Sequence, residues 1–184
     1  GFFIFNEIFS MKKVGVIVFI LLSSIAYSQA DSFPASWVGN WKGELLWYKT
    51  GKSEPQKVSM ELRIQPADST DSYTWQLIYG SKEEDYRPYI LKPINKTEGH
   101  WVIDELSGIV LDQFWRGYKF SGAFTVQKST IINSYWIEND KMFVEFYNIG
   151  AKPMVTTGKG TEEVPFVDSY KLGSYQKAVL VRTK

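Results

Sequence analysis

The chain of 184 residues contains no cysteine, which excludes disulfide bonds, a thiolate nucleophile, sulfur metal ligands and lipid attachment to a cysteine. It has one histidine, His100, and a single histidine cannot build a histidine-rich metal site. His100 is therefore either a surface histidine or a lone axial ligand of haem. Gly-x-Ser-x-Gly, P-loop and dinucleotide-binding glycine patterns are absent. We expect no metal and no cofactor, and no motif assigns a catalytic residue.

Neither sign of charge dominates, because 21 lysines and arginines oppose 20 aspartates and glutamates. Removal of the first 28 residues would leave a formal charge of zero. A chain without a basic face has no positively charged surface that would attract nucleic acid or an anionic membrane. The sequence therefore predicts a partner that is a small molecule, with no nucleic acid partner.

The N-terminal part has the pattern of a secretory signal peptide. Met11, Lys12 and Lys13 form a charged start, residues 14–22 are apolar without interruption, and small residues follow up to Ala30. We interpret residues 1–10 as an upstream extension, 1–30 as extension plus leader, and 31–184 as one domain. A secreted or bacterial periplasmic location is expected, with no membrane span after the leader is cleaved; the alternative is an uncleaved hydrophobic anchor.

Alternation of apolar and polar residues with a period of two is the strongest signal in the rest of the chain. It is cleanest at Val58, Met60, Leu62 and Ile64, which predicts a strand with one buried face. The same period places two further sets of residues on one side of a strand: Trp41, Gly43, Leu45 and Trp47, and Tyr73, Trp75, Leu77 and Tyr79. Further candidate strands are 86–92, 100–105, 109–115, 118–127, 130–137, 142–148 and 174–183.

Turn-forming residues separate nearly all of these segments, for example at Gly51, Gly80, Gly108 and Gly117. Short strands at this spacing predict hairpins joined in sequence. We therefore predict an all-β fold, an antiparallel up-and-down barrel of about 8–10 strands. The alternation breaks at 149–172, which predicts a long loop, either a lid over an opening or a surface excursion.

Gly39-Asn40-Trp41 at the first strand, together with Arg182 in the last, resembles the G-x-W arrangement of the lipocalins and the wider calycin group. The resemblance implies a closed barrel whose interior takes a small hydrophobic or amphiphilic ligand. It also implies a closing role for Gly39, Trp41 and Arg182, in which the tryptophan covers the barrel floor and the arginine packs across its indole.

Six strand tryptophans could line such an interior or fill a packed core: Trp41, Trp47, Trp75, Trp101, Trp115 and Trp136. Alternation aims Arg87 and Tyr89 to the same side, where the arginine could hold a ligand carboxylate. Otherwise Arg87 pairs with Glu83, Glu84 or Asp85 on the surface. The ligand-binding residues that we predict are Trp47, Trp75, Arg87, Tyr89, Trp101 and Trp136.

Two other functions remain open at this point. Asp104, Glu105 and Asp112 lie across one tight hairpin, and carboxylates in different environments can serve as acid and base, so a barrel enzyme is one alternative. Carboxylates at turns are also ordinary solvated turn formers. The second alternative is a β-sandwich that binds carbohydrate or protein through a row of exposed aromatic rings.

Overall fold

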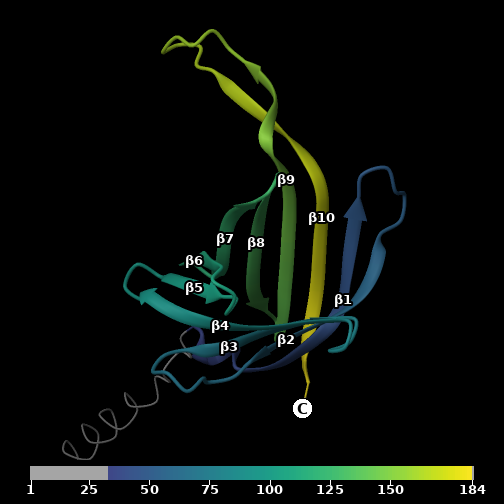
Figure 1. The fold of residues 1–184 in the computed structure, drawn as a ribbon, viewed down its shortest axis with the longest axis vertical. Helices are drawn as coiled ribbons and strands as arrows, with labels where there is room; N and C mark the ends of the chain where they lie inside the picture. Colours follow the sequence, from purple (N-terminus) through teal and green to yellow (C-terminus); the bar gives the residue numbers. More distant parts are fainter. Residues whose placement is uncertain (1–32, 184) are drawn as a thin grey trace, which may run out of the picture. The chain divides into compact units, whose positions relative to one another are not determined.

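The computed structural model describes residues 33–183 (Figure 1). The chain divides into an N-terminal unit that ends at Trp37 and a second unit that begins at Val38. In the described part of the first unit, the short 3-10 helix η1 (Ala35–Trp37) is closed by the Trp37 N–H, which donates to the Pro34 carbonyl at 2.9 Å. The predicted leader and the predicted boundary at residue 31 lie outside the described residues.

Ten antiparallel strands form a closed barrel in the second unit, and each strand pairs with its neighbours in sequence (Figure 1). The all-β, up-and-down barrel is thereby confirmed, and the sheet closes rather than folding into a sandwich. The strands are β1 (Gly39–Lys49), β2 (Gln56–Ile64), β3 (Tyr73–Tyr79), β4 (Asp85–Asn95), β5 (His100–Asp104), β6 (Val110–Arg116), β7 (Lys119–Val126), β8 (Ser129–Glu138), β9 (Lys141–Thr157) and β10 (Val167–Thr183).

The barrel closes where β1 pairs with β10, in a continuous register from Asn40 opposite Thr183 to Lys49 opposite Ser174. Trp41 lies directly opposite Arg182 in this register. Closure removes the edge between the first and last strands, because their backbone donors and acceptors satisfy each other along this register.

A packed apolar core fills the end of the barrel at which β1 begins. The predicted alternation in β2 is confirmed, because Met60, Leu62 and Ile64 are fully buried while their neighbours in sequence are less so. Leu62 pairs with Trp41 on one side and with Leu77 on the other, which joins three strands in one layer. Other fully buried side chains complete the core: Trp75, Leu91, Phe120, Tyr135, Met142, Val144 and Leu180.

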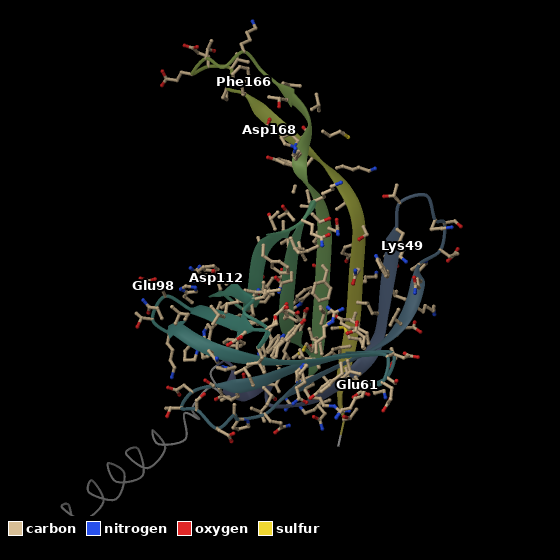
Figure 2. The ribbon with its side chains drawn as sticks, in the orientation of Figure 1. Lys49, Glu61, Glu98, Asp112, Phe166 and Asp168 are labelled. Carbon is tan, nitrogen blue, oxygen red and sulfur yellow. The ribbon has the colours of Figure 1, made fainter. Side chains whose placement is uncertain are left out.

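The prediction of a long loop at 149–172 is wrong, because most of that segment is strand. Beyond Gly150, β9 pairs only with β10, and the two strands project as a two-stranded ribbon past the barrel wall (Figure 1). Three register shifts interrupt the pairing near Tyr170 and Leu172. The first and third shifts reverse the side-chain parity of the pairing, and both faces of the ribbon are exposed, so no period of two survives in the sequence. Figure 2 shows Phe166 and Asp168 on this ribbon.

Candidate functional site

A cavity of about 1040 Å³ lies inside the barrel, at the end away from the Trp41 layer. Its position follows from the register: β1 contributes Leu45 and Trp47, whereas Trp41 belongs to the core at the start of the same strand. In β2 the cavity receives Val58, while Met60 and the later inward residues are core. Along each of these strands, inward side chains therefore serve the core at one end and the cavity at the other.

Apolar side chains make up most of the cavity wall. Six strands and one turn contribute aliphatic or aromatic groups to it: Leu45, Val58, Ile109, Leu111, Phe124, Ile131 and Phe146. Pockets of roughly 300–1,000 Å³ with walls of this kind are typical of sites that enclose a small organic molecule. The size and the lining together describe a space suited to one apolar or amphiphilic guest.

Charged and phenolic groups gather on one side of the cavity. Arg87 donates two hydrogen bonds to Asp85, from Nε to Oδ1 and from Nη2 to Oδ2, both at 2.8 Å. Its guanidinium carbon also lies 4.9 Å from the ring centre of Tyr79. All three residues line the cavity, together with Tyr89 and Glu105. The planar guanidinium is thus already committed to a carboxylate in a two-bond pairing, which is the strongest geometry available to it.

Burial and neighbouring charges shift the pKa values of this group. The hydrogen bond from Arg87 holds the pKa of the Asp85 carboxyl below its usual range, and the same pairing raises the pKa of Arg87. Burial raises the pKa of Tyr79 to about 12. Burial also raises the pKa of Tyr89, and the negative charge of Glu105 adds to the effect. At neutral pH both phenols are therefore neutral hydrogen-bonding groups.

Trp47 gives the cavity one more polar atom. Its indole Nε1 is buried and has no hydrogen-bond partner within the described part of the chain. The Lys49 ammonium lies 3.6 Å from the centre of the Trp47 ring and donates to Gln56 Oε1 at 2.7 Å. Figure 2 shows Lys49 at the end of β1. A buried N–H without an acceptor is costly, so the indole offers a donor to whatever fills the cavity.

The structure separates the six residues predicted to bind a ligand into three groups. Trp47, Arg87 and Tyr89 come together on the cavity wall. Trp75 and Trp101 are buried and do not line the cavity, and Trp75 packs edge-on against Tyr135 with ring centres 5.1 Å apart. Alternation predicted the inward direction of these two side chains but could not predict their depth along the barrel.

Trp136 lies on the outer face of the sheet, because its neighbour Tyr135 is buried and successive side chains alternate. Its ring stacks on Phe143 with centres 5.3 Å apart, and the Lys119 ammonium lies 4.1 Å above it. The sequence around it is apolar on both sides of the strand, so the direction of Trp136 was not evident from the period alone.

Gly39, Trp41 and Arg182 form the arrangement that the G-x-W pattern predicts. The guanidinium carbon of Arg182 lies 4.4 Å from the Trp41 ring centre, and the same guanidinium donates to the Val38 carbonyl. Gly39 has a φ of +149°, and a Cβ at this position would lie 2.9 Å from Nη1 of Arg182. Glycine is required here for its backbone conformation and for the space that the arginine occupies.

The three carboxylates of the enzyme alternative do not form one site. Asp104 accepts a hydrogen bond from Lys92 at 2.6 Å, which lowers its pKa, and Asp112 pairs with His100 at 2.7 Å. Glu105 alone lines the cavity. Within residues 33–183, no three histidine, cysteine, aspartate or glutamate side chains come together as a metal-ligand group.

Some residues of the site were not predicted as such. Tyr79 and Phe146 lie in predicted strands, but nothing in the sequence distinguishes a cavity position from a core position. Deeper in the interior, Gln113 and Asn133 are buried, and Asn133 Nδ2 donates to Gln113 Oε1 at 2.9 Å. In the sequence, this pair could have been found only as two single polar residues at inward positions of strands.

No known protein family model matches the chain, and no curated protein shows significant similarity to it. Within the described residues, the structure contains no helix with the length and hydrophobicity needed to cross a membrane.

Proposed function

We propose that the protein is an exported, lipocalin-like barrel that binds one small hydrophobic or amphiphilic molecule in its interior. The observation that carries the proposal is the cavity of about 1040 Å³, whose wall is mostly apolar and includes several polar groups. The Trp41–Arg182 closure at the opposite end supports the comparison with lipocalins. The leader-like residues 11–30 support export.

A neutral fluorescent probe, N-phenyl-1-naphthylamine, tests whether the cavity accepts an apolar guest. We expect saturable binding with one probe per chain and a rise in probe fluorescence as the naphthalene leaves water. Native mass spectrometry of protein purified from its own host is the second measurement, and it should reveal a bound adduct. Absence of saturable binding in the first experiment contradicts the proposal.

A pair of valine-to-tryptophan variants locates the binding site. Val58 lines the cavity beside Leu45, its partner on the neighbouring strand β1, so Val58→Trp places an indole in the space for the guest. Val179 is 44% exposed on β10, where Val179→Trp adds the same group to the outer face. We expect Val58→Trp to weaken probe binding by at least about tenfold and Val179→Trp to leave it unchanged. Equal affinities in the two folded variants would show that the probe binds elsewhere.

A further inference from the structure

The charges on the cavity wall carry information about the ligand, and this inference rests on the proposed function. Asp85, Arg87 and Glu105 are the charged side chains that line the cavity. Asp85 and Arg87 neutralise each other through two hydrogen bonds. Glu105 has no cationic partner within 4 Å among residues 33–183, and its side chain is half-buried. The cavity therefore carries one uncompensated negative charge.

A half-buried carboxylate without a counter-ion is unfavourable, because it loses hydration and gains only a neutral partner, the Tyr89 hydroxyl. Glu105 is held in this place by the β5–β6 turn, where its own N–H donates to the Ile109 carbonyl at 2.9 Å. A cationic guest would supply the missing partner. An anionic guest would meet two carboxylates, and Arg87 could offer it only the N–H groups that do not bond to Asp85.

The aromatic groups of the cavity favour the same class of guest. Tyr79 already accepts the Arg87 guanidinium against its ring, and Trp47 accepts the Lys49 ammonium at 3.6 Å. Both contacts show that rings on this wall carry their negative faces toward cations. Lys49 donates to Gln56 and forms no ion pair with Glu105.

We propose that the cavity selects an amphiphile with a protonated amine, with Glu105 as the counter-ion and the apolar wall around its hydrocarbon part. In this proposal Arg87 neutralises Asp85, which is the pairing that the sequence left open as the alternative to holding a ligand carboxylate. A ligand of this class places its ammonium beside the β5–β6 turn and its chain against Leu45, Ile131 and Phe146.

Three ligands with the same ten-carbon chain test the inference: decylamine, decanol and decanoate, each measured below its micelle concentration by displacement of the neutral probe at pH 7. Here the amine is protonated and the fatty acid is ionised. We expect decylamine to bind about tenfold more tightly than decanol, and decanoate to bind about tenfold more weakly than decanol. An affinity of decanoate equal to or above that of decylamine overturns the inference.

Glu105→Gln removes the charge and keeps the shape of the side chain. We expect this variant to lose the tenfold advantage of decylamine and to bind decanol as before. Glu44→Gln is the matched control, because Glu44 pairs with Lys57 on the exposed side of β1. An unchanged amine preference in Glu105→Gln also overturns the inference. Binding of decanol distinguishes the two proposals: if decanol binds without any amine preference, only the ligand class is wrong, and if no ligand binds, the proposed function fails as well.

Discussion

The contact between Gly39 and Arg182 makes a quantitative prediction about barrel closure. Gly39→Ala introduces a Cβ that would lie 2.9 Å from Nη1 of Arg182, at a backbone φ of +149° that side chains rarely adopt. The backbone strain costs about 2 kcal/mol. The displaced guanidinium loses its contact with Trp41, about 1 kcal/mol, and its hydrogen bond to the Val38 carbonyl, about 1 kcal/mol at this exposed position. We expect Gly39→Ala to lower the free energy of unfolding by about 4 kcal/mol.

Arg182→Met removes the same two interactions without the strain, so it should cost about 2 kcal/mol. In the double variant the added methyl group meets no guanidinium, and only the strain of about 2 kcal/mol adds to the loss. The double variant should therefore be about 2 kcal/mol more stable than the sum of the single effects predicts. Urea unfolding of all four proteins, followed by tryptophan fluorescence, measures this coupling.

Gly51→Ala is the control, because Gly51 also has a positive φ, +76°, but a Cβ there would have no atom within 4 Å. Its cost of about 1 kcal/mol should be the same with Arg182 or with methionine at position 182. Additivity of Gly39→Ala and Arg182→Met to within about 0.5 kcal/mol would refute the reasoning, because it would mean that the glycine and the arginine do not share space.

Two further predictions concern the core and the phenols. Leu62→Ala removes a fully buried side chain between Trp41 and Leu77 and should lower the free energy of unfolding by about 3 kcal/mol in urea, whereas Leu172→Ala at an exposed site should change it by less than about 0.5 kcal/mol. Burial raises the pKa of Tyr79 to about 12, so the stability that the neutral Tyr79 phenol contributes is present below its ordinary pKa of 10 and is lost as the pH rises through 12. The difference in tyrosinate absorbance between the wild type and Tyr79→Phe should therefore titrate near pH 12. A difference that titrates near pH 10 would contradict this.

The barrel was predictable because its wall has one buried and one exposed face. In β2 this contrast places Met60, Leu62 and Ile64 at every second position, and the structure buries all three. The pairing of Trp41 with Arg182 was also predictable, because a short motif at one end of the chain matched a basic residue at the other. The first prediction depends on a pattern that repeats locally along the sequence, and the second on a resemblance carried by residues at both ends of the barrel.

The depth of a side chain along the barrel was not predictable, because alternation shows which side chains point inward but not how far along the barrel they lie. Trp47 and Trp75 both point inward, yet one lines the cavity and the other is fully buried in the core. The ribbon at the ends of β9 and β10 was missed for a related reason: it has no buried face, so it leaves no alternation. Pro153 lies within β9, where it pairs with Tyr170 beside a register shift, a place at which strands accept proline.

The seam between β1 and β10 has a consequence for folding kinetics. It joins Asn40 to Thr183, whose hydroxyl donates to the Asn40 backbone carbonyl across 143 positions of the chain, whereas every other pair of strands follows a short connection. Loop-closure entropy opposes this contact most strongly, so the nine hairpins should form before the cylinder shuts. Linking the two ends and opening the chain at the Gly51 turn would make the β1–β10 pairing local and move the long-range seam to β1 and β2, so such a circular permutant should close the same wall of strands last at a different place.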